Sequence, residues 1–200
     1  MRSPPGRFRV YIKASPARHG LSVIYAIAQV TETRRVRAAV LTVSDAGARG
    51  ERPDESGELA VRRLTALPAE LVWRRVCADE PAEIRAAALE ATAAADLLVI
   101  TGGTGLGPRD LTPQTIAPLL DYEVPGMAEA MRAAGLRGTP HAMLSRQLAG
   151  VRGSCLLLAL PGSPRAVAES LDAVWAALPH ALRLLGGVRD GHHTGQVAAG

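Results

Sequence analysis

Short strand-like segments alternate along the chain with longer segments of helical pattern. The clearest strand is 96–101 (DLLVIT), which is apolar from Leu97 to Ile100 and is followed at once by a glycine cluster. A strand without a polar side has to be covered on both faces, as the central strands of parallel sheets are. The alternation therefore predicts an α/β fold, in the form of a three-layer domain with a mostly parallel central sheet and helices on both faces.

The same patterns give the bounds of the expected elements. Strands are expected at 36–44, 70–78, 96–101 and 153–162. Helices are expected at 54–67, at 79–95 with Asp79 or Glu80 as start signal, at 112–120, at 125–136 and at 163–185, the last broken near Pro179. In such sheets ligands bind beyond the carboxyl ends of the strands. The loops expected at that edge are 44–53, 102–111, 145–152 and 161–164.

The chain is expected to hold one domain with an addition at each end, because 200 residues suit a single domain. Residues 1–36 are expected to form an N-terminal extension, either a β-hairpin added to the domain or a partly ordered segment. Residues 37–186 form the expected domain. The glycine-containing residues 187–200 are expected to be a disordered tail.

The composition limits which classes of ligand the chain can bind and which cellular compartment it fits. The net charge is only +4, the basic residues are scattered and aromatic residues make up 3% of the chain, which disfavours a nucleic-acid-binding surface. No apolar run approaches the roughly 20 residues of a membrane span. Cys77 and Cys155 lie far apart, each in an apolar run, which favours buried free thiols in a reducing compartment and hence a cytoplasmic protein.

The segment 101–113 (TGGTGLGPRDLTP) has the composition of a phosphate-binding loop. Its small residues, whose backbone N–H groups can approach an anion, are Thr101, Gly102, Gly103, Thr104 and Gly105. No lysine follows the glycines as a Walker A loop requires, and Pro108 stands where the dinucleotide-binding fingerprint needs its third glycine. A tight turn without a ligand is the alternative interpretation.

Two carboxylates follow different strands at the same expected edge. Asp110 comes after the glycine loop, and Asp54 begins the next helix after the first strand, where Ser56 and Gly57 belong to an anion-binding helix N-terminus. Mg²⁺ prefers one or two carboxylates together with phosphate oxygens. We therefore expect Asp54 and Asp110 to share one Mg²⁺. The alternatives are that Asp54 is only a helix N-cap and Asp110 a solvated loop residue or auxiliary cap.

Further motifs follow in a fixed order along residues 37–185. They are LTVSD (41–45), DESG (54–57), TGGTGLGPRDLTP (101–113), VPGMAEAMR (124–132), MLSR (143–146) and GVRGSCLLLALPGSP (150–164), with AVAESLDAVWAALPHAL in the last helix. In this combination the chain resembles the molybdopterin adenylyltransferase family, which includes the G domains of gephyrin-type proteins.

The resemblance implies an enzyme that transfers AMP from Mg-ATP to molybdopterin and releases adenylyl-molybdopterin and pyrophosphate. It implies that Asp54 and Asp110 are the two functional aspartates and that the TGGTG loop contacts the nucleotide. It also implies that Ser145, with Arg146, lies near the pterin and that Pro161–Gly162 forms another turn of the rim.

The resemblance further implies a homotrimer and a handover of product to a molybdenum-insertion protein. The alternative is a paralogue of the same fold that binds molybdopterin or a nucleotide without catalysis, or a scaffold. The presence of both Asp54 and Asp110 favours the enzyme, because a scaffold needs no metal pair. The attacking pterin phosphate is already ionised, so no general base is required and no histidine is expected to be catalytic.

Overall fold

A computed structural model describes residues 35–187 of the chain. The predictions of an N-terminal extension and of a disordered tail fall on residues 1–34 and 188–200, which lie outside the described residues. No helix in the described part is long and apolar enough to cross a membrane.

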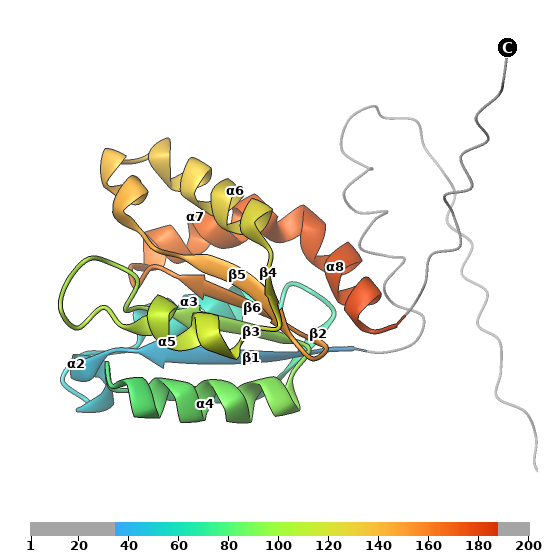
Figure 1. The fold of residues 1–200 in the computed structure, drawn as a ribbon, viewed down its shortest axis with the longest axis horizontal. Helices are drawn as coiled ribbons and strands as arrows, with labels where there is room; N and C mark the ends of the chain where they lie inside the picture. The colour runs from blue at the N-terminus through green and yellow to red at the C-terminus, as the bar shows by residue number, and fades with distance from the viewer. Residues whose placement is uncertain (1–34, 188–200) are drawn as a thin grey trace, which may run out of the picture.

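The central layer is a six-stranded sheet with the order β2-β1-β3-β6-β5-β4 (Figure 1). Its strands are β1 (Val36–Val43), β2 (Ala69–Cys77), β3 (Leu97–Thr101), β4 (Tyr122–Glu123), β5 (Leu148–Arg152) and β6 (Cys155–Leu160). β1 pairs in parallel with β2 and β3, and β3 pairs in parallel with β6. Only β5 runs antiparallel to its neighbours β4 and β6, so the predicted mostly parallel sheet is confirmed.

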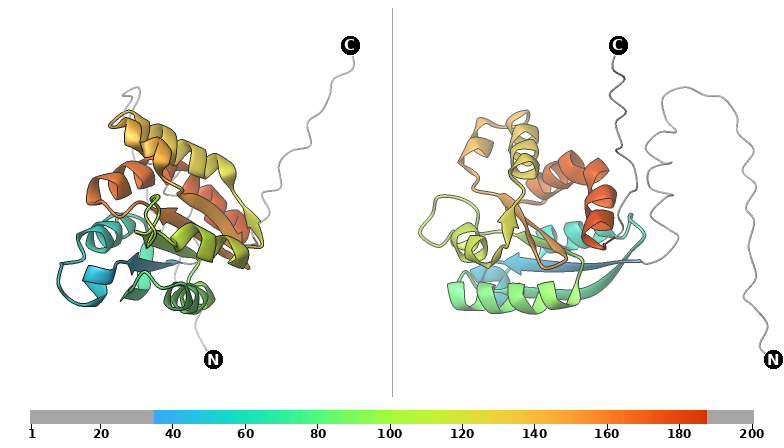
Figure 2. Two further views of the ribbon diagram at one scale, coloured as in Figure 1. Left: turned by 60° about the vertical axis from the view of Figure 1, so that its left-hand side comes forward. Right: turned by 45° about the vertical axis from the view of Figure 1, so that its right-hand side comes forward.

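Helices cover both faces of the sheet and complete the three layers. They are α2 (Asp45–Ala48), α3 (Glu55–Leu64), α4 (Pro81–Ala94), α5 (Thr112–Ile116), α6 (Pro125–Leu136), α7 (Pro164–Val174) and α8 (Leu178–Leu185), with the 3-10 turns η1 (Ala117–Leu119), η2 (Pro140–Leu144) and η3 (Trp175–Ala177). α4 and α5 pack on one face, and α3, α6, α7 and α8 pack on the other (Figures 1 and 2).

Strand β3 shows why the sheet needs helices on both sides. Leu97 and Val99 belong to the core on the α3 and α7 side, and Leu98 and Ile100 belong to the core on the α4 side. All four side chains are completely buried. Burial of such a side chain stabilises the fold by about 1.5–3 kcal/mol, so β3 is strongly anchored where the glycine loop leaves it.

The structure differs from the sequence expectations at β5. The sequence predicts a loop at 145–152, but Leu148–Arg152 is a strand that returns through Gly153 to β6. The positive φ of Gly153, 58°, suits the two-residue hairpin turn between the strands. Because β5 is antiparallel to β6, its first residues lie at the carboxyl edge of β6, and Ser145 just before them still reaches that edge. A second difference is α2, which occupies part of the predicted loop 44–53.

The two cysteines are buried free thiols, as predicted. Burial raises the pKa of Cys77 to about 11 and the pKa of Cys155 to about 12. Both thiols therefore stay protonated and unreactive at neutral pH.

Candidate active site

A cavity of about 530 Å³ opens at the carboxyl edge of the sheet. β2 lies on one side of β1 and β3 on the other, so the order of the strands reverses between β1 and β3. Ligands of open α/β sheets bind at such a reversal. The cavity lies there, lined by Thr42 and Val43 at the end of β1, by the glycine loop after β3 and by the Pro161–Gly162 turn after β6.

Most of the residues proposed from the sequence line this one cavity. They are Asp54, Ser56, Gly102, Gly103, Thr104, Gly105, Asp110, Ser145, Pro161 and Gly162. Thr101, Gly57 and Arg146 do not line it. Each of these three makes a structural contact behind the cavity wall instead.

Thr101 and Gly57 contact residues that line the cavity without lining it themselves. The Thr101 hydroxyl is fully buried, and its Oγ1 lies 3.0 Å from Ser56 Oγ. The Gly57 N–H donates to Asp54 Oδ1 at 2.8 Å. A Cβ at Gly57 would lie 2.2 Å from Asp54 Oδ2 and 2.4 Å from Thr42 Oγ1, so a glycine is required for these groups to pack together.

The start of the glycine loop has a backbone that only glycine adopts easily. Gly102 and Gly103 have φ values of 97° and 64°. A Cβ at Gly102 would lie 2.2 Å from the carbonyl oxygen of Val43, and one at Gly103 would lie 2.4 Å from Thr112 Oγ1. The Thr112 hydroxyl in turn donates to the carbonyl of Gly102 at 2.9 Å. The loop is thus held tightly against β1 and α5.

Arg146 holds the glycine loop from outside the cavity. Its Nε donates to the carbonyl of Gly105 at 2.8 Å, and one terminal nitrogen donates to the carbonyl of Asp110. The other donates to Gln114 Oε1 at 2.7 Å. The structure therefore gives Arg146 a supporting role outside the cavity, and its predicted place near the pterin stays a prediction. Ser145 does reach the cavity, with its Oγ 3.4 Å from Thr104 Oγ1.

Asp110 closes a turn and faces the cavity at the same time. Its Oδ2 accepts the N–H of Gly107 at 2.8 Å, and its own N–H donates to the Gly107 carbonyl at 3.0 Å. Its Oδ1 accepts no hydrogen bond from the described residues. Asp110 therefore caps this turn and not α5, whose N-cap is Leu111 without a side-chain hydrogen bond. The turn and a ligand-facing role are compatible, because each uses a different oxygen.

Asp54 is the N-cap of α3, and both of its oxygens are already in use. Oδ1 accepts from Gly57, as described above, and Oδ2 accepts from Thr42 Oγ1 and from Arg74, each at 3.0 Å. The Asp54 side chain is only 11% exposed. The sequence interpretation as a helix cap is confirmed, and this carboxylate has little capacity left for a metal ion.

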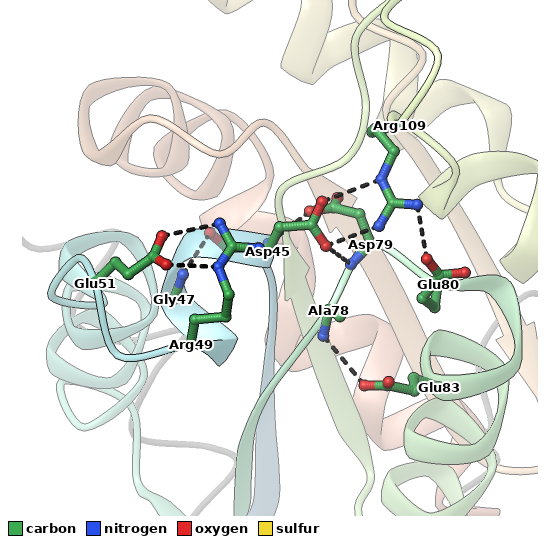
Figure 3. Close-up of polar contacts among 10 residues, drawn as sticks. Asp45, Gly47, Arg49, Glu51, Ala78, Asp79, Glu80, Glu83 and Arg109 are labelled. Atoms are coloured by element: carbon green, nitrogen blue, oxygen red, sulfur yellow. Dashed lines mark hydrogen bonds and ion pairs between the residues drawn. The ribbon is translucent and has the colours of Figure 1, made fainter.

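Asp79 is a further carboxylate of the cavity, which the sequence pattern marks only as a possible helix start. Its Oδ2 accepts the N–H of Asp45 at 2.8 Å (Figure 3). Its Oδ1 lies on the side of the glycine loop, where a Cβ on Gly103 would approach it to 3.2 Å. Burial raises the pKa of Asp79, and the charges of Asp45 and Asp110 raise it as well, against the lowering effects of the Asp45 N–H and of the Arg109 charge. The signal that finds Asp79 is the one used for Asp110, an acid just beyond the end of a parallel strand.

Other features of the cavity favour an anionic ligand. Two helices of ten or more residues, α3 and α7, begin at its wall, with Asp54 and Ser163 as N-caps. Helix N-termini attract anions. Arg52 is the one arginine among the described residues that line the cavity. His141 also lines the cavity from η2, a position that the sequence patterns do not indicate.

Residues 35–187 contain no group of three or more His, Cys, Asp or Glu side chains arranged to hold a metal ion. The described residues therefore offer a cation no more than two carboxylates together, and its remaining ligands would be phosphate oxygens and water. That is the usual coordination of Mg²⁺ with a nucleotide. Asp79 and Asp110 fit such a pair, because each has an oxygen that accepts no hydrogen bond from the described residues.

The fold and the cavity together define an α/β ligand-binding domain with an anion-binding loop at the reversal of its strand order. A family model described as a probable molybdopterin binding domain matches residues 39–180. The chain belongs to this family of molybdenum cofactor biosynthesis domains.

Individual relatives agree with the family match. The chain is 35% identical over 155 residues to a molybdopterin adenylyltransferase of Helicobacter pylori strain 26695, covering 75% of this chain and 88% of the relative. It is 44% identical over 157 residues to a molybdenum cofactor biosynthesis bifunctional protein of Synechococcus elongatus, covering 78% of this chain and 49% of the relative. The chain thus spans about half the length of that bifunctional relative.

A solved structure shows the same fold. The molybdopterin biosynthesis enzyme MoaB of Thermus thermophilus superposes with a TM-score of 0.71 at 48% identity, over 76% of this chain and 98% of that chain. The predicted resemblance to the molybdopterin adenylyltransferase family is confirmed by these relatives.

Proposed function

We propose that the chain transfers AMP from Mg-ATP to molybdopterin, with adenylyl-molybdopterin and pyrophosphate as products. The observation that carries the proposal is the meeting of a glycine loop with the carboxylates of Asp79 and Asp110 in one cavity of a molybdopterin-binding domain. Adenylyl transfer needs in-line geometry and neutralisation of phosphate charge more than covalent help from the protein.

The metal pair that we propose is Asp79 and Asp110 rather than Asp54 and Asp110. Asp54 already accepts three hydrogen bonds, whereas the other two carboxylates each keep an oxygen without a donor from the described residues. Bound Mg²⁺ would supply charge neutralisation on the transferred phosphates. Asp54 then fixes the N-terminus of α3 at the cavity wall.

The chain's own groups would bind and orient the substrates. The glycine loop and the N-termini of α3 and α7 would bind the phosphates, and Arg52 would add a positive charge at the cavity wall. The attacking group is the terminal phosphate of the pterin, which is ionised at neutral pH. No side chain has to remove a proton from it, so His141 needs no role as a general base.

The deciding experiment is incubation of the purified chain with molybdopterin, Mg²⁺ and ATP, with detection of adenylyl-molybdopterin and pyrophosphate. Titration calorimetry of ATP with Mg²⁺, and again with a chelator, separates the enzyme from a non-catalytic paralogue or scaffold. Mg²⁺-dependent ATP binding with product formation supports the proposal. ATP binding without product indicates the paralogue, and no ATP binding indicates a scaffold.

Ser145 is proposed to serve the pterin side of the cavity. Ser145→Ala is expected to weaken molybdopterin binding about 5- to 150-fold, the effect of an unsatisfied polar partner worth about 1–3 kcal/mol, with little change for Mg-ATP. Calorimetry with each ligand measures both affinities, and Ser154→Ala in the β5–β6 turn is the control. Because Ser145 Oγ lies next to Thr104 of the glycine loop, the experiment can also give the opposite result, in which ATP binding is weakened and molybdopterin binding is not. A loss confined to ATP would mean that the two halves of the site are assigned the wrong way round.

We also propose a homotrimer that does not need the first residues of the chain. The family motifs begin only near Val36, and large apolar side chains such as Tyr122, Leu136 and Met143 are exposed on the described domain, where subunit contacts would cover them. Light scattering of a chain that starts at Arg35 is expected to give three times the mass of one chain. A monomer from that shortened chain, with a trimer from the full chain, would show that the extension is required.

A further inference from the structure

Arg109 forms a fork with Asp45 beside the cavity (Figure 3). Its Nε donates to Asp45 Oδ2 at 3.0 Å and one terminal nitrogen donates to Asp45 Oδ1 at 2.8 Å. The other terminal nitrogen donates to Glu80 Oε1 at 2.7 Å. The whole guanidinium is therefore engaged by two carboxylates, with the planar geometry that distinguishes arginine from lysine.

Asp45 in turn fixes Asp79 from two directions. The N–H of Asp45 donates to Asp79 Oδ2 at 2.8 Å, and the N–H of Asp79 donates to Asp45 Oδ1 at 3.0 Å. This reciprocal pair determines both the backbone position and the side-chain direction of Asp79. The other carboxylate oxygen, Asp79 Oδ1, is left facing Gly103 of the glycine loop.

The contacts join three segments that are far apart in sequence. Asp45 follows β1, Glu80 follows β2, and Arg109 follows β3, so the network ties together the three loops at this edge of the sheet. The nearby fork of Arg49 on Glu51 has the same geometry, at 2.7 and 2.8 Å, but it joins residues of a single loop and reaches no carboxylate of the cavity. An exposed ion pair adds little stability by itself, so the value of the Arg109 network lies in what it positions.

We propose that Asp45 and Arg109 are positioning residues for Asp79, and that Arg109 does not bind the phosphates of the nucleotide. The inference deepens the proposed function, because it assumes that Asp79 holds the metal ion there. Arg109 also offsets the charge of Asp45, which otherwise lies next to the carboxylate that has to hold a cation. Residues that orient a metal-binding carboxylate typically affect metal affinity or activity by about 10- to 100-fold when they are changed.

The test compares Asp45→Asn, Arg109→Gln and the double variant with the matched control Arg49→Gln. Asp45→Asn keeps an acceptor for the Asp79 N–H but removes the charge that holds the Arg109 fork. Binding of Mn²⁺ in the presence of ATP is followed by electron paramagnetic resonance. ATP binding without metal, and kcat and KM for molybdopterin, are measured on the same proteins.

Each single variant is expected to lose about tenfold or more in Mn²⁺ affinity and in kcat, with unchanged KM for molybdopterin and unchanged metal-free ATP binding. The double variant is expected to be no worse than the more affected single variant, because the two residues act as one unit. Arg49→Gln is expected to match the wild type. If Arg109→Gln weakens metal-free ATP binding while Asp45→Asn does not, Arg109 is a phosphate ligand and the proposal is wrong.

A ligand-free measurement separates this inference from the proposed function. Hydrogen exchange of the Asp45 and Asp79 amides, measured by NMR, is expected to become at least about tenfold faster in Arg109→Gln and to stay unchanged in Arg49→Gln. A wild type that binds no Mn²⁺ with ATP would refute the proposed function, while faster exchange would still establish that Arg109 supports Asp79. Unchanged exchange in Arg109→Gln would overturn the positioning role whatever the chain binds.

Discussion

Asp110→Asn is expected to abolish adenylyl transfer while the protein stays folded. The substitution removes the charge that a Mg²⁺ ion needs beside the glycine loop, and a lost metal-positioning charge costs several kcal/mol at the transition state, about a thousandfold or more in rate. The asparagine oxygen can still accept the Gly107 N–H that closes the turn. Product formation and the thermal unfolding midpoint are measured together, so that loss of activity is not confused with loss of fold.

Asp121→Asn is the matched control for this prediction. Asp121 also uses one oxygen to cap a turn, accepting the N–H of Gly153 at 2.6 Å, but it lies away from the cavity. It is expected to keep full activity. Near-normal turnover of Asp110→Asn would contradict the metal assignment.

The other two carboxylates decide between the metal pairs. Asp79→Asn is expected to be as inactive as Asp110→Asn, and Asp54→Asn is expected to lose stability at the start of α3 rather than activity. If instead Asp54→Asn is the inactive variant and Asp79→Asn is not, the pair suggested by the sequence is the right one.

Local signals are enough to predict the four parallel strands β1, β2, β3 and β6 and the glycine loop. The apolar run of β3 requires cover on both faces, and the glycines after it require a backbone that approaches β1 closely. These properties belong to a few neighbouring residues, so they are visible in the sequence. The same is true of Asp54, whose position before a helical pattern marks it as an N-cap.

The directions of individual side chains were not predictable in this way. Arg146 follows Ser145 in the chain, yet the serine faces the cavity and the arginine reaches behind the loop to the carbonyls of Gly105 and Asp110. Asp79 carries the same sequence signal as Asp110, an acid just after a parallel strand, but its contact with the glycine loop depends on how the loop after β2 meets the loop after β3. That meeting is fixed by strand order, with β1 between the two strands.

The sequence pattern does not indicate strand β5, and the reason is a glycine required for packing. Gly150 weakens the strand pattern of this short segment, since glycine is unfavourable in strands. In the structure a Cβ at this position would lie 2.4 Å from Leu120 Cδ1 and 2.9 Å from the carbonyl of Tyr122. The glycine that hides the strand in the sequence is therefore the residue that lets β4 and the preceding turn pack against it.

Gly102→Ala is expected to cause the largest loss of stability among the glycine substitutions at the site. The residue combines a φ of 97° with a carbonyl oxygen of Val43 that would lie 2.2 Å from the new Cβ. The neighbouring atom is backbone of a central strand, so it cannot turn away as a side chain would. We expect a loss of more than about 4 kcal/mol in the free energy of unfolding, measured by urea denaturation.

Gly50→Ala separates the two causes of that loss. Gly50 also has a positive φ, 71°, but nothing lies within 4 Å of the position that a Cβ would take. Its substitution is expected to cost only the backbone strain, about 1–2 kcal/mol. The difference between the two variants then measures the close approach of the glycine loop to β1. Because that approach places Gly102 and Val43 together at the cavity wall, any Gly102→Ala protein that still folds should also have lost ATP binding. Equal losses in the two variants would show that the loop needs glycine for its φ alone and that β1 has room to move.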